Sequence, residues 1–422
     1  MPKSLSTIKQ MLVYADWKEL GGAQLMGTLR SEQLRGREVF SFAYDRGWLK
    51  KSSALLLDPD LSWFSGEQYN KEAKTNFGMF MDSSPDRWGR VLMQRKEALL
   101  AKRGDRKVRT LFESDYLLGV SDINRMGALR FRLDKDGPFL DDDQAMAVPP
   151  FTSLRSLEEA SLRLEQEDIK NDADLAKWLN LLMAPGSSLG GARPKASVMD
   201  PRGQLWIAKF PSNKDDRDMG GWEAVAANLA VKAGINMSES NARRFTQKHH
   251  SFLTRRFDRM GTSRIHYASA KTLLGEIDGA DAAAGISYLQ IAALIVRNGA
   301  RPQADLEELW RRIVFNIAIS NTDDHLRNHG FLLTDKGWIL SPAFDVNPTP
   351  NSSGLNLNIT EYSNATDMEL AREVAAQFRV QPQRSKGIIE QVEKAVRDWR
   401  KVAAGIGITR SEMQRMETAF IK

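Results

Sequence analysis

The 422-residue sequence contains no cysteine, only five histidines and no long apolar run. Without cysteine the chain cannot form disulfides, thiolate zinc sites or iron–sulfur clusters, and it has no cysteine nucleophile. No apolar run approaches the ~20 residues that a membrane-spanning helix needs, and the N-terminus lacks the apolar region and cleavage site of a signal peptide. We therefore expect a cytoplasmic protein that does not associate with membranes.

The charge and hydropathy of the chain are those of an ordinary globular protein. The 60 Lys and Arg residues against 54 Asp and Glu give a formal net charge of +6, and 42% of the residues are hydrophobic. This length suffices for two domains and a sizeable core. The modest charge permits an anionic partner without demanding one. Basic residues gather between positions 87 and 109, but interspersed acidic residues favour a solvated helix face over a nucleic-acid surface.

The first part of the chain has strand-like patterning followed by a helix signal. Apolar residues alternate or run together at 11–14, 24–29 and 39–44, with glycine-containing turns between them, and this predicts three strands. Ser84 as N-cap and Pro85 as first helical residue predict the start of a helix. The acidic, proline-tipped stretch 134–150 is the best candidate linker.

The second part alternates between helical and strand-like patterns before it becomes mostly helical after about residue 288. Strands are predicted at 196–199 and 205–210, on the C-terminal side of a glycine-rich segment. A helix is predicted from Trp222 to Lys232, since Gly234 is a good residue to follow a helix end. Thr409 and Glu412 have the spacing of a capping box for the last helix.

The segment Asn321-Thr-Asp-Asp-His-Leu-Arg-Asn328 has the spacing of a protein-kinase catalytic loop. Asp323 and Asn328 are separated by four residues, so that a carboxylate can orient an attacking hydroxyl while an amide oxygen coordinates magnesium. Strands at 330–333 and 337–340 predict a hairpin, and Asp345 follows it as a second carboxylate. Helix capping would explain any one Asp–Asn pair, but two carboxylates and an amide in this order favour the kinase interpretation.

A zinc hydrolase is an alternative interpretation of the same segment. His325 and His329 are four residues apart, and on a helix they would share one face, as in H-E-x-x-H. Leu326 stands where that motif needs its glutamate, so the alternative is much weaker.

The segment from Gly186 to Lys195 is rich in glycine and serine. Gly186 and Gly191 have the spacing of a Walker A loop, but Ala192 stands where its lysine belongs, so this motif fails. Backbone amides and a nearby lysine can still hold phosphate oxygens; an ordinary hairpin turn is the alternative. Lys209 ends the next strand and Glu223 begins the next helix, where kinases place an ATP-contacting lysine and its orienting carboxylate.

Taken together, these segments resemble the HipA family of bacterial toxin kinases over nearly the whole chain. The similarity lies in LVYADW, GTLR, FSFAYDRGWL and FMDSSPDRWGR, and then in SSLGGARPKA, WIAKFPS, LTRRFDR, NTDDHLRNHGFLL and SPAFDVNP. The resemblance implies an α+β, two-lobed kinase-like fold with a β-rich N-terminal module and a mostly helical C-terminal lobe. It also implies serine/threonine protein phosphorylation with ATP and Mg²⁺.

The resemblance also implies residue roles. Asp323 would be the catalytic base, Asn328 and Asp345 the magnesium ligands, and Lys209 a phosphate contact. Ser188 would be the autophosphorylation site, with Ser187 as the alternative. The full set expected to bind the nucleotide is Ser188, Gly190, Gly191, Ala192, Lys195, Lys209, Glu223 and His325.

One loop departs from the family pattern, since Gly-Ala-Arg-Pro-Lys stands at 191–195 where the best-known member has Gly-Ala-Gln-Glu-Lys. Pro194 removes a backbone donor and Arg193 adds charge, so this departure bears on the nucleotide contacts of the loop.

The expected organisation is an N-terminal module over 1–145 and a kinase-like core over 146–422, whose small lobe extends to about 285 and whose helical lobe covers 286–422. The resemblance implies three partners: a HipB-like helix-turn-helix antitoxin, a protein substrate such as an aminoacyl-tRNA synthetase, and DNA reached through the antitoxin. Two alternatives stay open: a small-molecule kinase of similar fold, and a non-catalytic component of a repressor complex.

Overall fold

The computed structural model divides into two compact units. Unit 1 comprises residues 1–213 and 258–268, and unit 2 comprises residues 214–257 and 269–422. Within them the structure describes residues 8–34, 36–51, 55–140, 148–166, 172–186, 191, 193–245 and 249–420. The predicted boundary between a module and a core near residue 145 stays a prediction.

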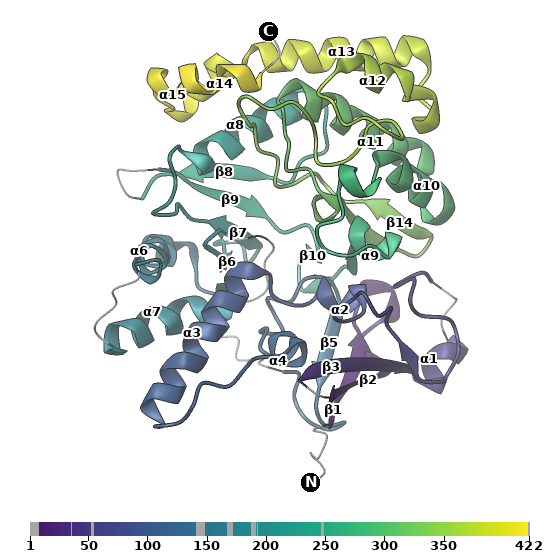
Figure 1. Cartoon of the computed structure of the whole chain (residues 1–422), viewed down its shortest axis with the longest axis vertical. Coiled ribbons are helices and arrows are strands. Elements are labelled where there is room, and N and C mark those ends of the chain that lie inside the picture. The colour runs from purple at the N-terminus through teal and green to yellow at the C-terminus, as the bar shows by residue number, and fades with distance from the viewer. Residues whose placement is uncertain are drawn as a thin grey trace. The chain divides into compact units, whose positions relative to one another are not determined.

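Unit 1 begins with a five-stranded antiparallel sheet of order β4-β3-β2-β1-β5 (Figure 1). Its strands are β1 (Ile8–Ala15), β2 (Gln24–Leu34), β3 (Arg37–Tyr44), β4 (Gln68–Tyr69) and β5 (Leu129–Arg132). Met11, Val13, Phe40 and Phe42 are at most 1% exposed and alternate with more accessible residues, as one buried sheet face requires. The three strands predicted from apolar alternation are therefore confirmed.

The helices of unit 1 include one whose start differs from the prediction. They are η1 (Lys18–Leu20), α1 (Arg46–Lys51), α2 (Gly78–Met81), α3 (Arg87–Arg103), α4 (Glu113–Leu118), η2 (Phe151–Ser153), α6 (Leu154–Leu164) and α7 (Asp172–Gly186). The N-cap of α3 is Asp86, so the prediction of Ser84 as N-cap is wrong. The Ser84 hydroxyl instead donates to the Phe80 carbonyl at 2.8 Å, because the chain there is still closing the preceding helix.

The later strands of unit 1 form short antiparallel pairs. They are β6 (Lys195–Met199), β7 (Leu205–Lys209), β10 (Arg259–Met260) and β11 (Ser263–Arg264), while β12 (Tyr267–Ser269) lies at the boundary of the unit. β6 pairs with β7 in a register that sets Lys195 opposite Lys209. The two strands predicted after the glycine-rich segment are confirmed.

Unit 2 is mostly helical. Its elements are α8 (Met219–Lys232), β8 (Ser240–Arg243), β9 (Ser251–Arg255), α9 (Ala270–Leu274), η3 (Ala282–Ala284), α10 (Tyr288–Asn298), α11 (Pro302–Ala318), η4 (Leu326–Asn328), β13 (Gly330–Thr334), β14 (Gly337–Leu340), α12 (Met368–Glu373), η5 (Ala375–Phe378), α13 (Pro382–Arg397), α14 (Trp399–Ile406), α15 (Arg410–Arg415) and η6 (Glu417–Ala419). The predicted hairpin is confirmed as β13 and β14, which are antiparallel.

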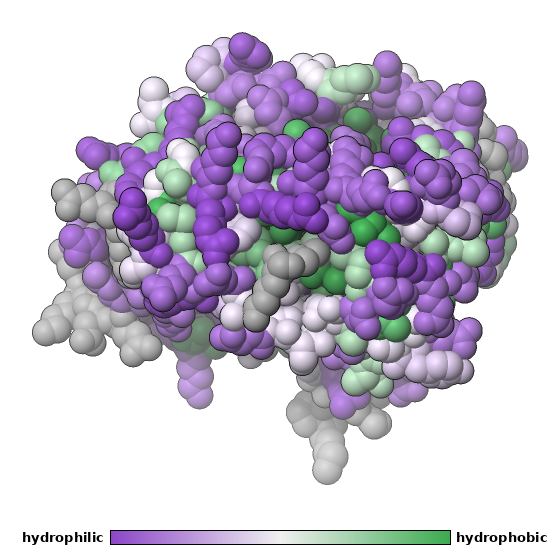
Figure 2. Space-filling view, turned by 90° about the horizontal axis from the view of Figure 1, so that it is seen from above, coloured by the Kyte–Doolittle hydropathy of each residue, from purple (hydrophilic) through white to green (hydrophobic). Residues whose placement is uncertain are grey.

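Helix α11 lies at the centre of the core of unit 2. It packs against α10, α12 and α13, and α14 packs against α8 (Figure 1). Trp310 of α11 is fully buried, and its indole nitrogen donates to the Ala371 carbonyl at 2.8 Å. α13 buries apolar residues spaced three and four apart, such as Ile389, Val392 and Val396, and turns its charged face outward. The face that carries α12 to α15 is accordingly largely hydrophilic (Figure 2).

The end of the chain is tied to α8 by a carboxylate. The Thr409 hydroxyl accepts from the Glu412 amide at 3.2 Å, so half of the predicted capping box is present. The Glu412 carboxylate instead accepts from the Asp218 amide at 2.7 Å and the Trp222 indole at 2.9 Å. Bonds to these buried donors stabilise the Glu412 carboxylate more than a bond to the exposed helix terminus would, because a buried donor left unpaired is costly.

Among the described helices, none has the length and apolar character needed to cross a bilayer.

Candidate functional site

The loop between α11 and β13 brings Asp323 and Asn328 together. The His325 amide donates to the Asp323 carbonyl at 3.0 Å, and the Asn328 amide donates to the His325 carbonyl at 2.8 Å. The Asn328 side-chain nitrogen also donates to the Asp323 carbonyl at 2.9 Å. Because its nitrogen end is bonded to this carbonyl, the amide oxygen of Asn328 faces the other way.

Asp345 follows β14 in a backbone conformation that is unusual for a residue with a side chain. Its φ is +56°, in the left-handed region, which costs a non-glycine residue about 1–2 kcal/mol. The Asn347 side chain donates to Asp345 Oδ1 at 3.2 Å. Strained residues of this kind cluster at functional sites, where the surrounding structure holds them.

Asp323 and Asp345 interact electrostatically. Asp323 as a residue is solvent-exposed, yet neighbouring chain removes water from much of its carboxylate. This desolvation raises the pKa of Asp323, the negative charges of Asp345 and Asp324 raise it further, and His325 opposes them. The charge of Asp345 thus acts on Asp323, whose main-chain carbonyl accepts from the Asn328 side chain. The roles predicted for these three residues stay predictions.

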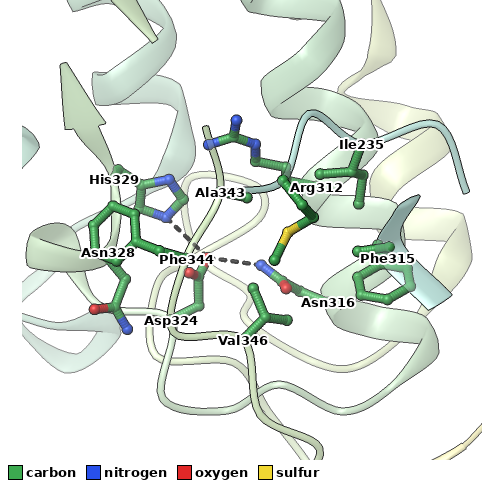
Figure 3. A pocket seen from close by; sticks show the side chains of 12 residues that line it. Ile235, Arg312, Phe315, Asn316, Asp324, Asn328, His329, Ala343, Phe344 and Val346 are labelled. Atoms are coloured by element: carbon green, nitrogen blue, oxygen red, sulfur yellow. Dashed lines mark hydrogen bonds and ion pairs between the residues drawn. The ribbon is translucent and has the colours of Figure 1, made fainter. Parts of the chain in front are cut away.

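Asp324 is a buried residue of this loop to which the sequence analysis gave no function. Its Oδ2 accepts from the Tyr288 hydroxyl at 2.7 Å. It also accepts from the Asn316 side chain at 2.7 Å and from His329 Nε2 at 2.9 Å (Figure 3). Burial raises the pKa of Asp324, but electrostatic attraction and the hydrogen bond from His329, together with the hydrogen bond from Tyr288, hold it below its ordinary value. His329 and Asn316 are near Asp324 in the sequence, but Tyr288 is 36 positions away, so no local spacing signals the complete set of donors.

A small cavity lies behind Asp324 and Asn328 and is lined by twelve residues (Figure 3). Its free space matches about one water molecule. Among the described residues, Arg312 Nη1 and His329 Nδ1 have no hydrogen-bond partner, and both residues line this cavity. A space of this size cannot hold a nucleotide.

The two histidines do not form a helical metal-binding pair. His325 precedes the short helix η4 and His329 follows it, and His329 Nε2 is bonded to Asp324. The described residues include no cluster of three or more histidines and carboxylates suited to a metal ion. Asn328 and Asp345 offer one amide and one carboxylate oxygen, which fits a magnesium ion that keeps phosphate and water as further ligands.

The predicted phosphate-contacting lysines lie in unit 1. Residues opposite one another on paired strands share a face, so Lys195 and Lys209 project from the same side of the β6–β7 hairpin. Lys195 is 3% exposed and Lys209 is half-buried. Two cations on one face match an anionic ligand. Glu223 is buried within α8 of unit 2 at its fifth position, so the prediction that it begins the helix is wrong.

The glycine-rich segment is described only in part. Ser187, Ser188, Gly190 and Ala192 lie outside the described residues, so their predicted roles stay predictions. Gly191 has a φ of +88°, a conformation that favours glycine.

Two residues of the SSPDRW segment, whose function the sequence left open, hold the end of this loop. The Asp86 carboxylate accepts from the Gly191 amide. The Trp88 indole donates to the Lys195 carbonyl at 3.1 Å, and the Trp88 amide donates to the Gly191 carbonyl at 3.4 Å. These contacts give the segment a positioning role beside the predicted nucleotide-binding residues.

The family model of the HipA-like C-terminal domain matches residues 187–399, which include the loop of Asp323, the hairpin and Asp345. The chain belongs to this family. The resemblance inferred from the NTDDHLRN and AFDV motifs is therefore confirmed.

Two curated relatives of this HipA-like protein carry kinase names. One, named "Putative kinase Y4mE", from Sinorhizobium fredii, is 26% identical over 152 residues, which are 33% of each chain. The other, named "Putative kinase", from Haemophilus influenzae, is 29% identical over 209 residues, which are 43% of this chain and 60% of the relative. The matched part of the chain thus spans about a third of the length of the first relative and 60% of the length of the second.

A solved structure shares the fold over nearly the whole chain. It is the HipA protein of Shewanella oneidensis in a toxin–antitoxin complex with HipB and operator DNA, and it matches with a TM-score of 0.65 at 16% identity. The alignment covers 98% of this chain and 95% of that one. The predicted α+β, HipA-like fold is confirmed.

Proposed function

We propose that this HipA-like protein is an ATP- and Mg²⁺-dependent serine/threonine protein kinase that acts as the toxin of a toxin–antitoxin pair. The observation that supports the proposal is that the negative charge of Asp345 raises the pKa of Asp323, while the Asn328 side chain donates to the Asp323 carbonyl. A base beside a metal-binding carboxylate is the arrangement that phosphoryl transfer requires.

Each residue of the proposed site has a separate role. Asp323 would orient the acceptor hydroxyl and take its proton, while Asn328 and Asp345 would hold Mg²⁺, which neutralises phosphate charge when bound. Lys195 and Lys209 would contact the phosphates of ATP. Catalysis would then come from positioning and charge neutralisation, with no covalent step on the protein.

The test is transfer of label from γ-labelled ATP to proteins of a cell lysate, followed by identification of the labelled protein. Asp323→Ala is the inactive variant, and Asp335→Ala is its matched control, since Asp335 is an exposed carboxylate at the turn of the β13–β14 hairpin. We expect label with the wild type and Asp335→Ala and none with Asp323→Ala. We further propose a translation component, such as an aminoacyl-tRNA synthetase, as the acceptor. Absence of transfer by the wild type contradicts the kinase assignment.

We also propose that the protein binds a HipB-like helix-turn-helix antitoxin and reaches DNA through it. Support comes from the fold it shares with a HipA that was solved with HipB and operator DNA. The net charge of +6 over 422 residues is small for tight binding to DNA alone. Gel-shift titration of the isolated chain should therefore show weak, salt-sensitive binding without sequence preference, and tight specific binding would contradict this.

A small-molecule kinase is the second candidate function, because the same two carboxylates and amide also serve transfer to a small hydroxyl acceptor. Label that appears on a metabolite and on no protein in the lysate assay would favour it. If the wild type binds antitoxin but transfers label to neither, the protein is instead a non-catalytic component of the repressor complex.

A further inference from the structure

Three asparagines connect the catalytic loop to Asp345. Asn316 lies in α11, Asn321 follows that helix, and Asn347 lies two residues after Asp345. Asn321 is fully buried and Asn316 is 3% exposed. Neither touches the proposed acceptor or metal, and the proposed function gives none of the three a role.

The hydrogen bonds of these side chains form one unbroken sequence. The Asn316 side-chain nitrogen donates to Asp324 Oδ2 at 2.7 Å (Figure 3), and the Asn321 side-chain nitrogen donates to Asn316 Oδ1 at 3.0 Å. Asn321 Oδ1 accepts from the Asn347 amide at 3.3 Å. The Asn347 side-chain nitrogen then donates to Asp345 Oδ1 at 3.2 Å.

Asn316 and Asn321 each form two of these hydrogen bonds with the nitrogen and the oxygen of the side-chain amide. Asn347 forms one with its main-chain amide and one with its side chain. An aspartate or a leucine of similar size cannot do this, because an ionised aspartate only accepts and leucine does neither. The sequence of bonds begins at Asp324, next to the proposed base, and ends on the proposed metal-binding carboxylate. The strained backbone of Asp345 needs such external support, since its φ of +56° is unfavourable by itself.

We propose that Asn316, Asn321 and Asn347 are positioning residues that set the separation of Asp323 and Asp345. This rests on the proposed function of those two carboxylates. Partners that orient a metal ligand typically contribute 10–100-fold to metal affinity or activity. Loss of one link should therefore loosen Asp345 without removing any group that touches ATP or the acceptor.

Asn347→Ala is the first variant, because Asn347 is half-buried and its loss leaves the core intact. We expect kcat to fall about 10-fold or more and the Mg²⁺ concentration for half-maximal rate to rise about 10-fold, with KM for the protein acceptor unchanged. Asn321→Ala removes two of these hydrogen bonds, those to Asn316 and Asn347. It should show the same lower kcat and higher Mg²⁺ requirement with an unchanged KM. The control is Asn358→Ala, since Asn358 is 4% exposed and its side chain donates to the Ala282 carbonyl at 2.9 Å, outside this sequence of bonds.

Hydrogen exchange gives a readout that does not depend on kinase activity. Amides of residues 321–329 and 345–347 should exchange faster in Asn347→Ala and Asn321→Ala than in Asn358→Ala. If the wild type transfers no phosphate but this exchange difference appears, the proposed function fails and the connection stands. If Asn347→Ala and Asn358→Ala lose equal activity and show equal exchange, the three asparagines only fill space and the inference is wrong.

Discussion

His266 should make unit 1 lose stability in mild acid. The residue is 1% exposed and stacks on Trp17, with ring centroids 5.2 Å apart, and its burial lowers its pKa to about 3. In the unfolded chain an imidazole has a pKa of about 6.5, so the unfolded state binds more protons below that pH. Stability attributable to this residue is therefore lost as pH falls from about 6.5 toward about 3.

The size of the effect follows from the two pKa values. Each pH unit within this window costs about 1.4 kcal/mol, so a change from about pH 7.5 to about pH 5 costs ~2 kcal/mol. The assay is urea unfolding of the wild type and His266→Phe at both pH values, because phenylalanine keeps the stacked ring and cannot titrate. Asp58, whose pKa burial raises to about 6, titrates in both proteins, so its contribution cancels.

The wild type should lose ~2 kcal/mol more than His266→Phe over this pH change. Equal losses in the two proteins would refute the reasoning, since they would show that His266 is protonated without cost in the folded state.

Three further predictions concern the proposed site. Asp323→Ala should abolish phosphoryl transfer but keep Mg²⁺-dependent ATP binding in titration calorimetry, whereas Asp345→Asn should lose both and keep its melting temperature, because asparagine tolerates the left-handed backbone. Phosphosite mapping should find phosphate on Ser188 in the active protein and none there in Asp323→Ala; an unmodified loop would contradict the autophosphorylation prediction. Asp324→Ala leaves three buried donors unpaired at a cost of roughly 1–3 kcal/mol each, so its melting temperature should fall. A melting temperature within a degree of the wild type would contradict the stabilising role of Asp324.

Much of the fold was predictable, because it follows from local periodicity and turn chemistry. The strands β1, β2 and β3 alternate clearly, and the β13–β14 hairpin follows from two apolar runs around Asp335 and Lys336. The start of α3 was not predictable, because Ser84 serves the preceding helix equally well. Both serine and aspartate are good N-caps, and only the path of the chain decides between them.

The candidate site likewise has some residues whose positions were predictable from the sequence and others whose positions were not. Asp323 and Asn328 were predictable because one short turn, closed by their own hydrogen bonds, brings them together. The left-handed backbone conformation of Asp345 was not predictable, because no pattern in a single sequence indicates a positive φ at a non-glycine residue. Asp324 was missed because Tyr288, one of its partners, is 36 positions away. Contacts of this range are fixed by packing, and packing is what a motif does not encode.

The adjacent aspartates show how one loop serves both stability and chemistry. The pKa of Asp323 is raised by partial burial and by neighbouring negative charge, while that of Asp324 is lowered by the donors around it. Asp324 therefore stays ionised and fixed, and its neighbour stands at the surface with a higher affinity for a proton. A base that must accept a proton from a hydroxyl benefits from such a raised pKa. Because the buried, hydrogen-bonded Asp324 is the next residue along the chain, its hydrogen bonds also fix the position of Asp323, the proposed base.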